Sequence, residues 1–189
     1  MKKIRLIVLA FVVTFLLNGC IPILLGGAAA TLVVYDKRSF RTIFDDSNIK
    51  QKILVRMRTH PDLEKTHVGV AAMNYDVLLI GQVRYASQRI TIQRIARNTP
   101  KVKHIYNAIT VSPNVSTKRR AKDSWITSNV KSDMIIKPGL RSGEIKAVTE
   151  NGIVYLMGRV SRYQARLATN VARRVSGVKK VVTLFKYDD

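Results

Sequence analysis

The sequence offers few side chains that could carry out catalysis or bind a metal. An enzyme needs a nucleophile with its base, a pair of carboxylates or a metal cluster, whereas this chain has one cysteine and three histidines in 189 residues. His60, His67 and His104 do not have the spacing of metal ligands. Asp45 and Asp46 form a carboxylate pair beside a predicted helix start, where we expect a capping role. The sequence therefore predicts a non-enzymatic protein without catalytic residues, metal, cofactor or small-molecule substrate; an exported enzyme remains an alternative without positive support.

Cys20, the one cysteine, lies where an export signal would end. A basic start (residues 2–5) precedes an apolar run (residues 6–17), an order that is typical of a secretory signal peptide. The residues Leu17-Asn18-Gly19-Cys20 resemble the lipobox of bacterial lipoproteins, in which the cysteine is lipid-modified and becomes the mature N-terminus. We therefore expect residues 1–19 to be cleaved and Cys20 to carry the lipid anchor.

An uncleaved membrane anchor is the alternative for this terminus. Residues 21–35 are also apolar and extend the hydrophobic stretch to a length that could span a bilayer. Pro22 and the Gly26-Gly27 pair interrupt this stretch, which favours cleavage and lipidation. By resemblance to the sorting rule of Gram-negative lipoproteins, Ile21 in place of aspartate predicts a lipid-anchored protein on the periplasmic face of the outer membrane.

Positive charge is the dominant chemical property of the chain. It has 33 Lys+Arg against 12 Asp+Glu, a net charge of +21, and loses three basic residues with the signal peptide, which leaves +18. The densest cluster is Lys118-Arg119-Arg120-Ala121-Lys122, which contains no acidic residue. Such a run can be a solvated connector. In a membrane-tethered protein it can also bind anionic headgroups, because each Lys or Arg near the surface contributes about 1 kcal/mol.

Trp125 is the single residue most suggestive of a membrane contact. It precedes Ile126, which we expect to face the core. The chain contains an internal repeat with an offset of 77 residues, and Asn48 occupies the position equivalent to Trp125. A position that accepts Asn in one copy is not expected to be fully buried in the other, so the indole could lie at headgroup depth with Lys131 supplying charge. The alternative is that Trp125 covers the edge of the core or the interface between the two copies.

Two copies of one unit follow the N-terminal segment. An offset of 77 residues aligns Asp46-Ser47-Asn48-Ile49 with Asp123-Ser124-Trp125-Ile126, and the register continues for some forty residues. After one residue inserted in the first copy, Ile95-Ala96-Arg97 aligns with Val171-Ala172-Arg173. The sequence therefore predicts two homologous domains.

The hydrophobic periodicity changes in the same order within each copy. We expect an opening helix capped by Asp46 or Ser47, and by Asp123 or Ser124 in the second copy. Two strands, a helix and a last strand follow; their predicted ranges are 68–73, 77–83, 87–98 and 102–111, then 145–149, 153–160, 162–175 and 178–185. The predicted fold class is α+β, with the order α-β-β-α-β and two helices packed on a three-stranded mixed sheet.

The hairpin motif Val-x-Leu-x-Gly-x-Val, at residues 77–83 and 154–160, and Ser176-Gly177-Val178 before the last strand resemble the BON domain. The resemblance predicts five segments: a lipoprotein signal peptide (1–19), a lipidated tether (20–43), a first BON domain (44–112), a basic linker (113–122) and a second BON domain (123–189). Dual-BON outer-membrane lipoproteins are associated with anionic phospholipid, outer-membrane integrity and cell-division sites, and these are the functions that the resemblance implies.

These observations lead to one hypothesis and two rivals. The leading hypothesis is an outer-membrane lipoprotein whose second BON domain binds anionic phospholipid; its expected site residues are Trp125, Lys131, Lys118, Arg119, Arg120 and Lys122. The runner-up is a periplasmic scaffold that binds an outer-membrane assembly protein or another envelope partner, with the charge steering association. Nucleic acid would also fit the charge, but the export signal argues against it.

Overall fold

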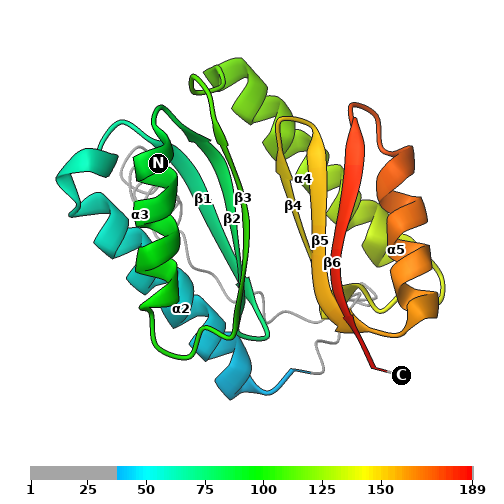
Figure 1. The fold of residues 1–189 in the computed structure, drawn as a ribbon. Helices are drawn as coiled ribbons and strands as arrows, with labels where there is room; N and C mark the ends of the chain where they lie inside the picture. Colours follow the sequence, from blue (N-terminus) through cyan, green and yellow to red (C-terminus); the bar gives the residue numbers. More distant parts are fainter. Residues whose placement is uncertain (1–37, 189) are drawn as a thin grey trace, which may run out of the picture. The chain divides into compact units, whose positions relative to one another are not determined.

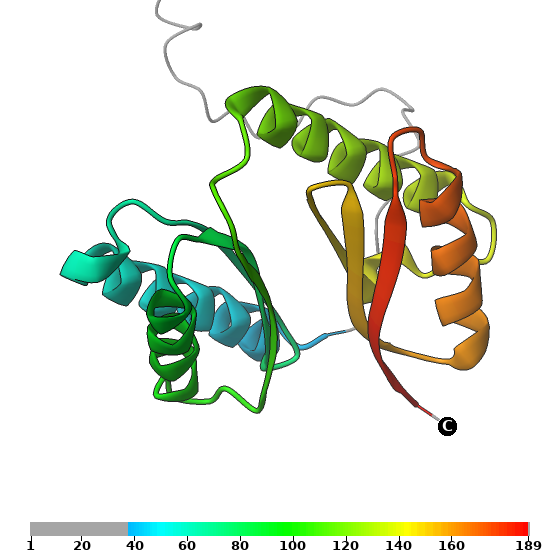
Figure 2. The same ribbon diagram turned by 45° about the horizontal axis from the view of Figure 1, so that its top comes forward.

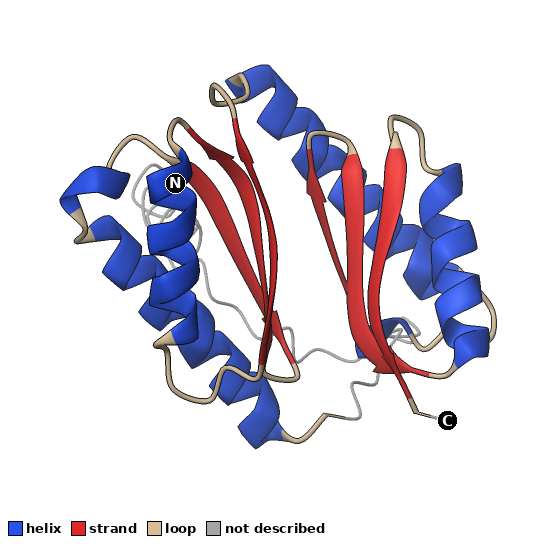
Figure 3. Ribbon diagram, viewed as in Figure 1, coloured by secondary structure: helices blue, strands red, loops and turns tan. Residues whose placement is uncertain are grey.

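The computed structural model describes residues 38–188, so the predicted signal peptide, Cys20 and most of the predicted tether lie outside the described part. Two units with the same element order follow one another along the chain (Figures 1 and 3). The first unit contains α2 (Phe40–Arg58), a 3-10 turn (Pro61–Leu63), β1 (His67–Met73), β2 (Asp76–Val83), α3 (Ala86–Arg97) and β3 (His104–Val111). The second contains α4 (Thr117–Ile136), a 3-10 turn (Ser142–Glu144), β4 (Ile145–Glu150), β5 (Ile153–Val160), α5 (Arg162–Arg174) and β6 (Lys180–Tyr187).

Each unit folds into a three-stranded mixed sheet with its helices on one face. In the first sheet the order is β1-β2-β3, with β1 antiparallel and β3 parallel to the central strand; the second sheet repeats this as β4-β5-β6. A parallel connection requires a crossover, and α3 and α5 supply it on the same face as α2 and α4 (Figure 1). The α+β prediction, with its order of elements, is confirmed.

The helix faces of the two sheets carry equivalent cores. In the first unit Ile49 and Ile53 of α2 pack with Val77 and Leu79 of the central strand. The matching residues of the second core are Ile126, Val130, Val154 and Leu156. Burial of such aliphatic side chains contributes about 1.5–3 kcal/mol each, so each unit has a substantial core of its own.

Both opening helices begin earlier than expected. Ser39 caps α2 by accepting a hydrogen bond from the N–H of Thr42 at 3.2 Å, and Ser116 caps α4 in the same way. The predicted caps at Asp46 or Ser47 and at Asp123 or Ser124 are therefore wrong. The last residues of the predicted tether, from Phe40, belong to α2, and the predicted linker is helical from Thr117 onward.

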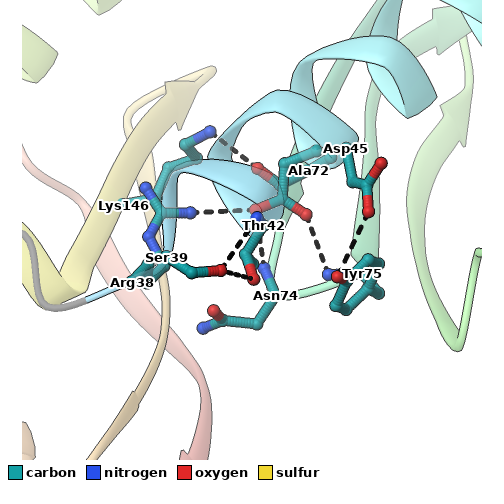
Figure 4. Close-up of polar contacts among 9 residues, drawn as sticks. Arg38, Ser39, Thr42, Asp45, Ala72, Asn74, Tyr75 and Lys146 are labelled. Atoms are coloured by element: carbon teal, nitrogen blue, oxygen red, sulfur yellow. Dashed lines mark hydrogen bonds and ion pairs between the residues drawn. The ribbon is translucent and has the colours of Figure 1, made fainter.

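Asp46 and Asp123 instead bind the hairpin turns of their sheets. Asp46 accepts hydrogen bonds from the N–H groups of Asn74 and Tyr75, both at 2.8 Å. Both turn residues have positive φ, as a tight hairpin turn requires. Arg38 pairs with the same carboxylate at 2.9 Å (Figure 4). The carboxylate thus connects the opening helix to the turn before the central strand.

The second unit repeats this arrangement with equivalent residues. Asp123 accepts hydrogen bonds from the N–H groups of Asn151 and Gly152 at 2.8 and 2.9 Å. Arg119, one helical turn before it, supplies the cation at 3.1 Å. The two carboxylates are almost fully buried, so their negative charge depends on these partners.

A third apolar cluster joins the faces of the two sheets that carry no helix. It contains Leu78 and Ile80 of β2 and Tyr155 and Met157 of β5. Polar contacts border it: Lys186 Nζ lies 2.7 Å from Asp76, Gln82 donates to Glu150 at 2.8 Å, and Lys146 donates to the carbonyl of Ala72 at 2.7 Å (Figure 4). Burial is the main cause that lowers the pKa of Lys146. The two domains therefore contact each other mainly through strands, and one flank of α4 borders a cleft that β1 also lines.

We expect Asp123→Asn to destabilise the fold. The substitution removes the negative charge that balances Arg119. It also removes one of the two oxygen acceptors that bind the turn, so the free energy of unfolding should fall by about 2 kcal/mol. Urea denaturation of a chain that begins at Ile21 measures this, because all three apolar clusters lie within residues 38–188. Asp133→Asn is the matched control, since Asp133 is exposed on the same helix, and should change stability by less than about 0.5 kcal/mol. Equal effects of the two substitutions would contradict the turn-binding role.

Candidate functional site

The predicted phospholipid-binding residues of the second domain all lie on one helix. Lys118, Arg119, Arg120, Lys122, Trp125 and Lys131 belong to α4. Figure 2 shows α4 beside α5 on the helix side of the second sheet. Its inward stripe contains Asp123, Ile126, Val130 and Met134, all buried. The remaining circumference of α4 is therefore the surface on which the predicted residues must be placed.

Trp125 lies on an exposed flank of α4. Its side chain is 52% exposed, and Ile136, eleven residues later, is 66% exposed. Because a helix turns by about 100° per residue, eleven residues return to nearly the same direction, so both apolar side chains lie on one face. The expectation that Trp125 is not fully buried is confirmed. The contact between the sheets is made by strand residues, so Trp125 lies outside it. The predicted cap at Asp123 or Ser124 would have placed Trp125 in the first turn, whereas the helix start at Thr117 places it in the third.

Two lysines share the Trp125 flank. Lys118 precedes Trp125 by seven residues and points in nearly the same direction, and Lys122 lies between this direction and the core stripe. The stem of Lys122 packs beside the turn between α5 and β6, since a Cβ placed on Gly177 would lie 3.2 Å from its Cε. This packing lets the apolar stem be covered while the ammonium group stays in water. We call Lys118, Lys122, Trp125 and Ile136 the tryptophan face.

Arg120 and Lys131 lie on the other flank of α4. By helical geometry they point about 120–140° away from Trp125. Arg120 lines, with Thr127, a cleft of about 400 Å³ that also includes His67 and Glu150. The structure therefore does not bring all the predicted basic residues together, but divides them between two flanks.

Arg119 has a structural role. Its side chain is 19% exposed and pairs with the buried Asp123. The stem of Lys179 packs against the same turn, because a Cβ on Gly152 would lie 3.0 Å from its Cγ and close to Arg119. Lys179 and Ile136 are residues that the sequence analysis missed. The spacing of eleven residues could have indicated Ile136, but the position of Lys179 depends on the tertiary fold.

The equivalent position in the first unit carries the opposite charge. Asp45 of α2 occupies the place of Lys122, and Lys101 in the turn after α3 occupies that of Gly177. Lys101 Nζ lies 2.6 Å from Asp45, and this hydrogen bond is the main cause that lowers the pKa of the carboxyl. In the second unit this internal ion pair is absent, and a lysine with its head in solvent stands in its place.

Neither a metal cluster nor a membrane-spanning helix is found in the described residues, and the predicted alternative of an uncleaved anchor lies outside them. Within residues 38–188 no three His, Cys, Asp or Glu side chains gather as a metal site requires. His67 Nε2 lies 3.9 Å from Glu150, and His60 lies at the same distance from Asp62. None of the helices in this described region has the length and apolar content needed to cross a membrane.

Comparison with known proteins agrees with the repeat and the fold. The BON domain family matches residues 45–113 and 122–189. The outer membrane lipoprotein DolP of Haemophilus influenzae is 36% identical over 100% of this chain and 97% of its own length. A 21 kDa hemolysin of Actinobacillus pleuropneumoniae is 35% identical, with 80% and 79% of the two chains covered. The osmotically-inducible protein Y of Escherichia coli is 29% identical, with 72% and 70% covered. With two matches that together span most of its length, the chain belongs to the BON domain family and carries two copies of the domain.

Proposed function

We propose that this protein is a non-enzymatic outer-membrane lipoprotein whose second BON domain docks on anionic phospholipid through the tryptophan face of α4. The name of the Haemophilus relative supports the outer-membrane lipoprotein role, and Cys20 is the residue that would carry the acyl chains. The periplasmic face and the support of outer-membrane integrity follow from that role. A location at division sites stays a prediction from the resemblance.

The observation that carries this proposal is an exposed indole flanked by lysines on one helix face. An indole at a membrane interface buries its apolar ring while its N–H stays hydrated. Lys118 and Lys122 lie on the same flank, where each would contribute about 1 kcal/mol near an anionic surface. Ile136 extends the apolar part of this face toward the end of the helix.

The first domain differs at two central positions of this face, although Phe44 and Val55 are exposed on the corresponding flank of α2. At the positions of Trp125 and Lys122 it has Asn48 and Asp45, and the latter is paired internally with Lys101. An acid and an amide in these places offer no aromatic ring for insertion and no free cation for a headgroup. We therefore assign docking through an inserted indole to the second domain and a supporting role to the first.

The acyl anchor makes weak docking sufficient. A tethered domain meets the membrane at a high effective concentration, so contacts of a few kcal/mol can keep it on the surface. The overall charge contributes a diffuse attraction that salt screens over a Debye length of about 8 Å at physiological ionic strength. Contacts through the tryptophan face would fix the orientation of the second domain on the membrane.

We expect Trp125→Glu to weaken vesicle binding about tenfold, which corresponds to roughly 1.4 kcal/mol. The measurement is co-sedimentation of the chain from Ile21 with vesicles of phosphatidylcholine alone or with phosphatidylglycerol. Wild type should bind only the anionic vesicles, because the site combines ring insertion with charge. Tyr85→Glu is the control, as Tyr85 is an exposed aromatic residue of the first domain. Unchanged binding by Trp125→Glu, or an equal loss with Tyr85→Glu, would contradict the proposal.

A second test compares two charge reversals of equal size on the same helix. Lys118→Glu with Lys122→Glu changes the tryptophan face, whereas Arg120→Glu with Lys131→Glu changes the opposite flank by the same net charge. We expect the first pair to reduce binding to anionic vesicles at least about fivefold more than the second, since only the first lies beside the inserting ring. Equal losses would mean that the chain is held by net charge alone. Absence of wild-type binding to either vesicle would favour the envelope-protein scaffold.

A further inference from the structure

A second basic surface lies on the second domain, away from the tryptophan face. A groove of about 470 Å³ runs between α5 and the edge strand β6. Arg162, Arg166 and Arg173 line its helix side, and Thr183, Phe185 and Tyr187 line its strand side. We propose that this groove binds an acidic polypeptide segment in extended conformation, which adds to β6 as a further strand and directs its carboxylates toward the arginines. The site uses no residue of the tryptophan face, so it does not depend on membrane docking.

The edge of β6 is open to strand addition. Among the described residues, β6 pairs only with β5, in parallel. In a parallel pair about half of the N–H and C=O groups of a strand point toward the partner and the others point away. An edge strand therefore presents a row of unpaired backbone groups to any extended chain that reaches it. Thr183 and Tyr187, which line the groove, are exposed along this strand.

The arginines form a row that matches an extended chain. Arg162, Arg166 and Arg173 are four and seven residues apart, so they lie on one face of α5 with axial separations of about 6 and 10 Å. Side chains on one face of a strand repeat every ~6.8 Å, so acidic residues at alternate positions of a bound segment would match the gap between Arg162 and Arg166, and Arg173 would lie between the next two acidic positions. A guanidinium group can bind a carboxylate through two parallel hydrogen bonds.

Two arginines of the groove, Arg166 and Arg173, have no carboxylate partner in the described part of the chain. Among residues 38–188, no Asp or Glu lines the groove. Within residues 38–188, neither Arg166 nor Arg173 forms an ion pair with a carboxylate. Arg162 lies over the ring of Tyr187, with its Cζ 4.7 Å from the ring centroid, and this contact orients its planar head at one end of the groove. The groove is therefore complementary to an anionic ligand.

The first domain has different side chains at the equivalent place. Ala86 and Ile90 stand where the second domain has Arg162 and Arg166. Gln93 of α3 accepts a hydrogen bond from Asn107 of β3 at 2.8 Å, which joins the helix to the edge strand. Arg97 is the one arginine of the row that both domains share. The cationic groove is thus a property of the second copy and not a consequence of the common fold.

A peptide fits these features better than a lipid headgroup does. The cations follow a line parallel to a strand edge, and the opposite wall offers backbone groups and aromatic rings. A headgroup would use the cations but not the edge, whereas an extended acidic segment uses both. The expected partner is therefore a protein with an exposed strand or unfolded segment that has Asp or Glu at alternate positions.

The test is fluorescence anisotropy with labelled peptides and the chain that begins at Ile21. The probe is a peptide of about ten residues with alternating Thr and Asp, long enough for one strand. We expect saturable binding that Arg166→Gln with Arg173→Gln weakens at least tenfold. Arg94→Gln with Arg97→Gln, on the equivalent helix of the first domain, is the matched control of equal charge change and should weaken binding less than twofold. An equal loss in the two double variants, or no saturable binding by wild type, would overturn the proposal.

Peptide chemistry separates strand addition from simple attraction of an anion. The same Thr-Asp sequence with N-methylated backbone amides keeps its charge but cannot complete a strand ladder, and it should bind at least tenfold more weakly. Equal binding of the methylated peptide would overturn strand addition. Displacement of the bound peptide by anionic vesicles from the wild type, but not from the Trp125→Glu variant, would place the peptide on the tryptophan face and also overturn the proposal.

A cross-linking experiment tests the position directly. The chain from Ile21 contains no cysteine, because Cys20 is the only one in the sequence. Thr183→Cys introduces a thiol in the groove, and Asn107→Cys introduces one at the equivalent strand position of the first domain. A peptide whose central cysteine is activated as a mixed disulfide with thionitrobenzoate should form a disulfide with the first variant, with release of thionitrobenzoate, at least tenfold faster than with the second. Equal rates would overturn the assignment of the peptide to β6.

Discussion

One buried carboxylate in each domain, Asp46 or Asp123, determines how the opening helix lies on the sheet. Each accepts two backbone hydrogen bonds from the turn before the central strand and pairs with an arginine. Since the turn leads into the most buried strand of the domain, the carboxylate fixes both the rotation of the helix and the register of the hairpin. In the second domain the same contact determines which flank of α4 is outward, and it uses Arg119 from the basic cluster as its cation.

Much of the fold could be predicted from the sequence, because the repeat allowed each copy to check the other. The strands lie within about two residues of their expected ranges, and the α-β-β-α-β order is as expected. The helix starts were missed because Asp-Ser before an apolar residue has the pattern of a cap, and no local pattern distinguishes a cap from a carboxylate that binds a turn 28 residues away. The contact between the sheets could also have been predicted, because the central strands are apolar on consecutive residues, as expected when both faces of a strand are buried.

The candidate site was predicted in its parts but not in its arrangement. The sequence indicated that α4 carries Trp125 and a dense group of cations. It could not show how these cations divide around the helix, because the division depends on which stripe packs inward. Arg119 belongs to the interior, Lys118 and Lys122 share the flank of Trp125, and Arg120 lines a cleft with His67. A basic cluster in sequence is therefore not a basic patch in space.

The differences between the two copies suggest how a duplicated domain gains a binding surface. The strand faces without helices are used in the contact between the domains, so new function must arise on the outer faces of the helices or at the free strand edges. At these places the first copy pairs its polar groups internally, Asp45 with Lys101 and Gln93 with Asn107. The second copy has Lys122 and Gly177 in place of the first pair and a row of arginines near the second. Within residues 38–188, Lys122, Arg166 and Arg173 have no carboxylate partner, so their charge is available to an external anion, and the core beneath them needs no change.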